Sequence, residues 1–316
     1  MKAKKILLII FFNLAIILAE IIFGLVSNSF ALIADALHNT GDVIAIVITY
    51  IALRFGTSSP TFQYTFGFIR AEMMAAFTNT LFLLLTMIYM IYESIGRLFH
   101  PEIIAPEYMI VVGMIAVVAN GISAYLLHSM GVEDHHHHHH HHDHHEHEHP
   151  HHHHHEDANI TSAYLHMLAD TLISVGVVVA GFMIYHFEIY AIDAVLTILF
   201  SLYIIKHSFP LFKRSFLSLM DANTLDITLE QLESIIFSSS HVSSYHDLHI
   251  YQPNSKLKFI SFHVLLENED TSLKTCETIT GPMKENLEKL GFNHILIQVD
   301  SLTNEAAHQK CVIANQ

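Results

Sequence analysis

Six stretches of roughly 20 apolar residues fill most of the first 209 positions of this 316-residue chain. A stretch of that length crosses the hydrocarbon core of a bilayer as a helix, because a helix satisfies all its backbone hydrogen bonds internally. The first stretch is expected to be retained, since no small-residue cleavage site follows it. The expected spans are Ile6–Val26, Phe30–Leu53, Met73–Ile95, Tyr108–Leu127, Ala163–Phe187 and Ala191–Phe209. The sequence therefore predicts an integral membrane protein, an all-α bundle of six helices over residues 1–209.

The pattern changes after Phe209, where polar residues and short alternating segments begin. A helix, two strands, a helix and a strand are expected in that order, which is typical of a small α+β domain with ferredoxin-like layering. The expected elements are Leu229–Ser238, Ser243–Gln252, Lys256–Glu267, Ser272–Leu290 and Ile295–Asp300. The sequence thus predicts a second domain over residues 210–316.

The distribution of charge sets the expected orientation and excludes one class of partner. Lysines and arginines precede the first span, flank the second connection and follow the sixth span, whereas Arg97 alone lies on the opposite side. Basic residues favour the cytoplasmic side, so both termini and the second domain are expected there. The net charge of −15, without a basic stripe, argues against nucleic-acid binding. We expect a multi-pass protein of a bacterial inner membrane.

Two motifs of the form HxxxD lie inside these apolar runs, His38–Asp42 and His166–Asp170. An Asp at the centre of a membrane helix costs about 2.5 to 3.5 kcal/mol, so each carboxylate needs a compensating partner. Residues four apart share one helix face, so each motif presents an imidazole and a carboxylate together. If the two faces meet, they form a closed set of two nitrogens and two oxygens, which suits tetrahedral Zn²⁺.

A purely structural interpretation exists for these polar residues. Each His and Asp would then hydrogen-bond a neighbouring helix, but two pairs of identical spacing favour a metal site. Asp35, three residues before His38, either orients that imidazole or hydrogen-bonds within the bundle. Glu20 is expected to belong to a polar seam between helices.

The second domain carries its own candidate ligands. His246, Asp247, His249 and His263 lie on the two adjacent predicted strands, and Asp300 ends the third. His246 and His263 are expected to approach each other, with Asp300 as a third ligand, although histidines on strands are often only solvated. His308 and Cys311 form a weaker set.

The stretch Glu133–Asp157 holds 17 of the 29 histidines, with acidic residues among them. Such a composition cannot build a packed core, so we expect a disordered cytoplasmic loop. Many neutral imidazoles in sequence favour capture of metal ions, and a charge-tunable linker is the alternative.

With these residues located, the sequence resembles the cation diffusion facilitator family of divalent-metal transporters, in its zinc-transporting branch. The resemblance rests on five separated segments. They are Ser29–Asp42, Tyr64–Glu72, His166–Asp170 with Ser174 and Gly176, Leu219–Ala222 and His246–His249.

The resemblance implies a six-helix homodimer with a cytoplasmic metal-binding domain. Its transport site would be His38, Asp42, His166 and Asp170, and its regulatory site would include His246, His263 and Asp300. Gln298 departs from the pattern, because some relatives have a histidine there.

The resulting expectation is a transporter, not an enzyme, which exports cytoplasmic Zn²⁺ in exchange for H⁺. Protons compete with Zn²⁺ for the same imidazole lone pairs, since an unperturbed His titrates near pH 6.5; the outward direction is implied by the family. The alternatives are an exporter of a broader metal range (Co²⁺, Cd²⁺, Ni²⁺), a membrane-anchored zinc buffer or sensor, and a zinc channel. A metallohydrolase would need an open ligand position and a general base on an ordered helix. The HExxH pattern occurs here only inside the low-complexity His-rich stretch, at His145–His149 and His147–His151.

Overall fold

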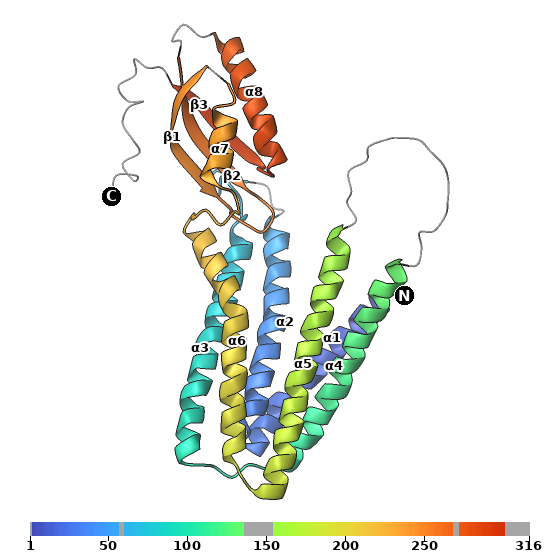
Figure 1. Ribbon diagram of the computed structural model, residues 1–316. Helices are drawn as coiled ribbons and strands as arrows, with labels where there is room; N and C mark the ends of the chain where they lie inside the picture. The colour runs from blue at the N-terminus through green and yellow to red at the C-terminus, as the bar shows by residue number, and fades with distance from the viewer. Residues whose placement is uncertain (1, 57–59, 136–153, 240, 268–271, 301–316) are drawn as a thin grey trace. The chain divides into compact units, whose positions relative to one another are not determined.

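The computed structural model describes residues 2–56, 60–135, 154–239, 241–267 and 272–300 (Figure 1). The described chain forms two compact units. The first contains the chain as far as Ile44 together with Leu81–Phe209, and the second contains Ala45–Thr80 with the residues from Pro210 onward. Each unit contains one of the two sets of candidate metal ligands.

Within the described residues, six long helices precede residue 220. They are α1 (Lys2–Ser27), α2 (Phe30–Gly56), α3 (Ala71–Phe99), α4 (Pro106–His135), α5 (His154–Phe187) and α6 (Ala191–Leu219). Four of them are long and apolar enough to cross a membrane in their described parts: α3, α4 over Pro106–Tyr125, α5 over Met167–Phe187, and α6. In α1 the corresponding apolar part, Asn13–Ser27, is shorter. The expected helical membrane fold is confirmed.

Large apolar side chains on these helices are exposed, as a bilayer requires. Leu25, Tyr92, Tyr125 and Leu172 are each more than 60 % exposed in the isolated chain. Exposed apolar surface on a helix is stabilised by lipid, and the helix backbone leaves few groups unsatisfied there. Polar residues such as Glu20, Asp35 and Asp170 are instead buried between helices.

The start of α2 is fixed by an acidic residue of α6. Asp193 accepts hydrogen bonds from the Ser29 hydroxyl at 2.6 Å and from the backbone N–H of Phe30 and Ala31 at 2.9 and 3.2 Å. These N–H groups have no partner within the helix, so a buried carboxylate at that position caps α2 and complements its dipole. Arg97 secures the preceding turn by donating to the backbone and side-chain oxygens of Asn28, both at 2.6 Å.

Two glycines allow α4 and α5 to pack closely. A Cβ atom at Gly113 would lie 2.7 Å from the Val178 side chain, and one at Gly181 would lie 2.9 Å from that of Ile110. Small residues at such crossings let two membrane helices approach, and packing then holds them together. The close contact fixes the position of α5, the helix that carries His166 and Asp170.

The second unit includes a sheet with two helices. Its order along the chain is α7 (Leu229–Ile236), β1 (Val242–Tyr251), β2 (Phe259–Leu266), α8 (Leu273–Lys289) and β3 (His294–Asp300). The sheet order is β1-β2-β3, with β1 and β2 antiparallel and β2 and β3 parallel. This αββαβ order is the one that the sequence predicted, with boundaries displaced by three residues or fewer.

The core of this unit lies between the helices and one face of the sheet. Alternate β2 residues Ile260, Phe262 and Val264 are buried there with apolar residues of α7 and α8. Because side chains alternate along a strand, His263 projects from the opposite face of the sheet. Thr228 caps the N-terminus of α7, and Ser272 caps the N-terminus of α8.

Several helices extend beyond the predicted spans. Helix α4 ends at His135 and not at Leu127, and α5 begins at His154 and not at Ala163. Helix α6 does not end at Phe209 but continues through Pro210 to Leu219. Pro removes one backbone hydrogen bond but does not prevent the helix from continuing when packing compensates the loss. Beyond Pro210, Phe212 and Phe216 lie against Phe77, with ring centroids 5.4 and 5.9 Å apart.

Candidate metal sites

The first candidate site lies inside the first unit, where α2 and α5 bring their polar faces together. The Nε2 atom of His38 lies 3.7 Å from Oδ2 of Asp42 and 3.9 Å from Oδ1 of Asp170. His38 and Asp170 are 5 and 3 % exposed, and the Asp42 side chain is 36 % exposed. Three of the four predicted ligands are therefore neighbours, and each carboxylate lies less than 4 Å from the imidazole of His38.

The fourth predicted ligand is placed only by its helix. His166 belongs to α5, one turn before Asp170, and its side chain lies outside the described residues. Residues four apart on a helix share a face, so its position on α5 is the one that the i,i+4 spacing requires. The sequence Glu133–Asp157 also lies largely outside the described residues, and its metal-capturing role stays a prediction.

A polar network surrounds His38 on α2. The Asn39 side-chain amide donates to Oε2 of Glu20 at 3.2 Å and to Oδ1 of Asp35 at 3.4 Å. Glu20 is fully buried and Asp35 is 2 % exposed. Glu20 thus belongs to a seam between α1 and α2, as expected. Asp35 has a hydrogen-bonding partner within the bundle, which favours the structural interpretation of this residue.

The second candidate site lies on the open face of the sheet in the second unit. His246 and His263 are directly opposite each other in the β1–β2 register, with ring centroids 4.9 Å apart. Asp300, at the end of β3, places Oδ2 2.7 Å from Nδ1 of His263 and 3.4 Å from Nε2 of His246. The three predicted residues therefore converge, although Asp300 belongs to a strand that reaches β2 only through α8.

Gln298 orients Asp300. Its side-chain amide donates to Oδ1 of Asp300 at 2.9 Å, so the other carboxylate oxygen is the one that faces the two histidines. Burial acts to raise the pKa of Asp300, but hydrogen bonds from Gln298 and His263 and the charges of the two histidines hold that pKa below its ordinary value. The carboxylate is thus kept ionised, as a metal ligand must be.

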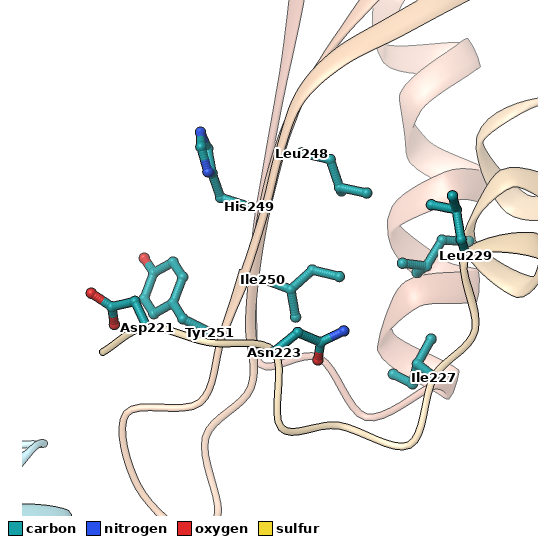
Figure 2. Close-up of a pocket in the computed structure, with 9 residues that line it drawn as sticks. Asp221, Asn223, Ile227, Leu229, Leu248, His249, Ile250 and Tyr251 are labelled. Carbon is teal, nitrogen blue, oxygen red and sulfur yellow. The ribbon is translucent and has the colours of Figure 1, made fainter. Parts of the chain in front are cut away.

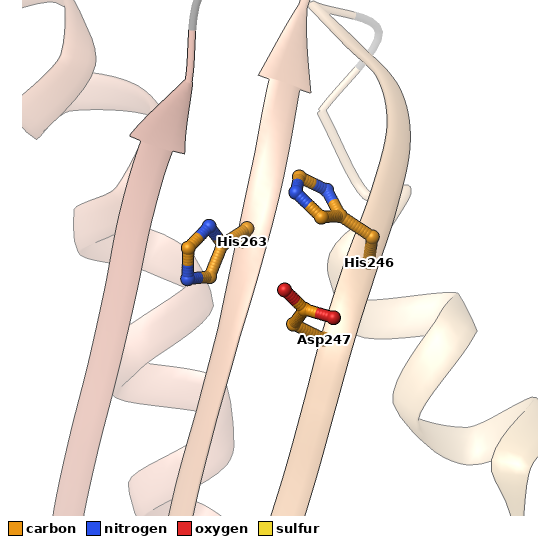
Figure 3. A group of neighbouring side chains, drawn as sticks. All are labelled: His246, Asp247 and His263. Carbon is orange, nitrogen blue, oxygen red and sulfur yellow. The ribbon is translucent and has the colours of Figure 1, made fainter. Parts of the chain in front are cut away.

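Sequence reasoning missed how Asp247 takes part in this cluster. A carboxylate oxygen of Asp247 and one nitrogen each of His246 and His263 all lie within 4.8 Å of one another (Figure 3). In a regular strand Asp247 would point to the face opposite to that of His246. It does not, because the register of β1 shifts between His246 and His249.

A cavity of about 620 Å³ lies beside β1 in the same unit, and it is separate from the histidine cluster. Figure 2 shows His249 and Tyr251 on one side of the strand and Leu248 and Ile250 on the other. The lining also includes Asp221, whose carboxylate pairs with Arg70 at 2.7 Å. One imidazole among mostly apolar residues is not the ligand set of a zinc site.

Comparison with protein families assigns both parts of the chain. Residues 6–220 match the family model described as the cation efflux transmembrane domain. Residues 225–302 match the model described as the cation efflux protein, cytoplasmic domain. Together these matches include both candidate metal sites and leave out only the first residues, a short connection and the last residues of the chain.

Several characterised bacterial proteins are similar over most of their length. A cadmium, cobalt and zinc/H⁺-K⁺ antiporter of Bacillus velezensis is 28 % identical over 306 residues, covering 96 % of this chain and 90 % of the relative. The zinc transporter ZitB of Pectobacterium atrosepticum is 29 % identical, covering 81 and 73 %. The metal cation efflux system protein CzcD of Cupriavidus metallidurans is 29 % identical, covering 92 and 84 %. The chain belongs to the cation efflux, or cation diffusion facilitator, family of multi-pass membrane transporters.

Proposed function

We propose that this cation efflux protein exports cytoplasmic Zn²⁺ in exchange for protons, through the site on α2 and α5. The observation that carries the proposal is the approach of His38 to both Asp42 and Asp170, at 3.7 and 3.9 Å, in the bundle interior. Asp170 is buried and Asp42 is partly exposed, and two carboxylates that flank the same imidazole repel each other unless a cation lies between them. A divalent cation neutralises both.

The ligand set determines which cation fits best. With His166 as the fourth member, the site offers two imidazole nitrogens and two carboxylate oxygens. Zinc favours four ligands of these types in a tetrahedron and has no competing geometric preference. The ZitB relative is named as a zinc transporter, and the Bacillus velezensis relative is named as an antiporter of cadmium, cobalt and zinc. A broader divalent range is therefore the second candidate function.

Proton exchange follows from the chemistry of the same ligands. Imidazole binds a metal only when its nitrogen is deprotonated, so a proton arriving at His38 or His166 competes directly with zinc. The site would bind zinc while it faces the cytoplasm, where proton activity is low. It would release zinc on the other side, where proton activity is high. Rocking of the helices would alternate its access.

We further propose that the protein acts as a homodimer in a bacterial inner membrane, with both termini in the cytoplasm. The division into a membrane domain (residues 1–209) and a cytoplasmic domain (210–316) is part of this proposal. The cluster of His246, His263 and Asp300 would bind zinc as a regulatory ligand. Its half-buried position on a sheet face leaves it accessible to zinc from the aqueous phase.

The decisive experiment measures ⁶⁵Zn²⁺ flux in vesicles reconstituted with the purified protein. An antiporter takes up zinc when the vesicle lumen is acidic, and its flux collapses when an ionophore dissipates the pH gradient. A channel conducts zinc down its own gradient regardless of pH, and a buffer or sensor gives binding without flux. Either of those two results would overturn the proposal.

A further inference from the structure

Strand β1 contains an extra residue at the point where it faces the histidine of β2. Its register with β2 pairs His246 with His263 and next pairs His249 with Ser261. Three steps along β1 thus correspond to two along β2, which defines a β-bulge. Asp247 lies within the bulge and has a left-handed backbone, with φ of +52°.

The bulge changes the direction of the Asp247 side chain. In a regular strand, consecutive side chains point to opposite faces of the sheet. Here His246 and Asp247 both have ligand atoms near His263, within 4.8 Å of one another (Figure 3). A bulge commonly re-aims a side chain at a functional site, and an observed left-handed non-glycine residue is a reason to look for function.

Asp247 and Asp300 approach the same pair of imidazoles from different strands. Oδ2 of Asp300 lies 2.7 Å from Nδ1 of His263 and 3.4 Å from Nε2 of His246. With Asp247, the cluster has two imidazoles and two carboxylates, the same composition as the proposed transport site. The Gln298 side-chain amide donates to Oδ1 of Asp300 and so orients that carboxylate.

We propose that Asp247 is a direct ligand of the zinc ion at the cytoplasmic site, together with His246, His263 and Asp300. This inference rests on the proposed regulatory binding of zinc at that cluster. Four ligands then come from one chain, and two carboxylates balance the charge of Zn²⁺.

The competing explanation is that Asp247 serves the backbone alone. Asp and Asn are both enriched at left-handed positions, because their short polar side chains hydrogen-bond locally. The substitution Asp247→Asn therefore keeps the conformational preference and removes the negative charge. His249→Asn is the matched control, because it alters a residue of the same bulge that lies outside the cluster.

The assay reads zinc binding at this cluster alone, in the full-length protein in detergent. Diethyl pyrocarbonate modifies imidazoles that no metal protects, and mass spectrometry of tryptic peptides then locates the modification. The peptide Phe259–Lys274 contains His263 as its single histidine, so the His-rich stretch and the transport site do not contribute to its signal. Zinc is titrated in a chelator-buffered series, and the midpoint of His263 protection gives the apparent affinity.

Asp247→Asn should move this midpoint to at least about tenfold higher free zinc, since even residues behind the ligands change affinity by 10- to 100-fold. His249→Asn should leave the midpoint unchanged. An unchanged midpoint in Asp247→Asn overturns the inference and leaves the three-residue site intact. Absence of zinc protection in the wild type overturns the inference together with the regulatory site, while ⁶⁵Zn²⁺ flux in vesicles tests the transport proposal separately.

A measurement on the wild type covers the case in which the variants misfold. Carbodiimide labelling of carboxylates, read in the peptide that contains Asp247, should fall as zinc protects His263, with the same midpoint. Labelling of Asp247 that does not respond to zinc would refute a direct ligand role.

Discussion

The two candidate metal-ligand clusters of this protein both consist of His and Asp residues, but they are built in different ways. In the helical unit, ligands four apart on a single helix share a face, and two helices bring their faces together. In the sheet unit, ligands come from three strands and meet through register, a crossover and a bulge. In the helical cluster the side chains of His38 and Asp170 are 6 and 4 % exposed and that of Asp42 is 36 % exposed. In the sheet cluster the two imidazoles are more open, at 16 % for His246 and 29 % for His263, while Asp300 is 8 % exposed.

This difference in the burial of the imidazoles is consistent with the different tasks proposed for the two clusters. A buried, charged cluster is costly when empty, so its occupant must be a cation or protons, and exchange of one for the other is a transport step. A partly exposed cluster is stabilised by water when empty and equilibrates with zinc in solution. We therefore expect substitutions in the helical cluster to change what crosses the membrane, and those in the sheet cluster to change how transport responds to zinc.

The largest expected effect comes from Asp170→Ala, which should reduce ⁶⁵Zn²⁺ flux to that of protein-free vesicles. The change removes one ligand and one of the two charges that balance the cation. Folding and dimer formation should survive, as judged by size-exclusion chromatography of the purified variant. Flux close to wild type would show that the four-residue set is not the transport site.

Asp193→Ala provides the structural counterpart in the same bundle. Asp193 caps α2 through three hydrogen bonds and is not part of the ligand set. Its loss should lower the free energy of unfolding by about 1 to 3 kcal/mol, because buried donors lose their partner. Thermal melting in detergent measures this, and the folded fraction should keep its zinc preference. A changed metal preference in Asp193→Ala would show that the cap of α2 also influences the metal site.

An intermediate effect is expected from His38→Asp, which should retain zinc transport and admit Cd²⁺ or Mn²⁺ more readily. One imidazole becomes a harder ligand that binds through one or two oxygens, so four-coordination is no longer enforced. Competition of each metal against ⁶⁵Zn²⁺ uptake gives the selectivity. An active variant with unchanged discrimination between Zn²⁺ and Cd²⁺ would place the selectivity elsewhere in the bundle.

A milder effect is expected from His263→Asn in the sheet cluster. Transport should persist at saturating zinc, while the zinc concentration that gives half-maximal flux shifts, because a regulatory site changes the response and not the pathway. Flux measured over a series of buffered zinc concentrations tests this. Complete loss of flux in a folded variant would show that the sheet cluster belongs to the transport pathway.

Deletion of Glu133–Glu156 from the His-rich stretch should have the smallest effect. Tethered imidazoles raise the local zinc concentration, so their removal should lower flux at low zinc and leave it unchanged at saturating zinc. Replacement by a Gly/Ser linker of equal length is the control for connectivity. Loss of flux at every zinc concentration would mean that the stretch is part of the transport mechanism.

Much of this molecule follows from local sequence patterns. Apolar runs of membrane-spanning length determined the helical bundle, and i,i+4 spacing determined that His38 and Asp42 share a face. Alternation in the polar part determined the αββαβ order and placed His263 opposite the core. These features depend on periodicities of 3.6 and 2 residues, which the backbone imposes wherever the segment lies.

Contacts between distant segments were decided only by the tertiary structure. The cap of α2 by Asp193, the approach of α4 and α5 at Gly113 and Gly181, and the position of Asp300 beside His263 each join residues far apart in the chain. The inserted residue in β1 gave Asp247 a direction that alternation forbids, and the helix through Pro210 continued where propensity predicts an end. Periodicity determines which face a residue occupies, whereas packing determines which faces meet.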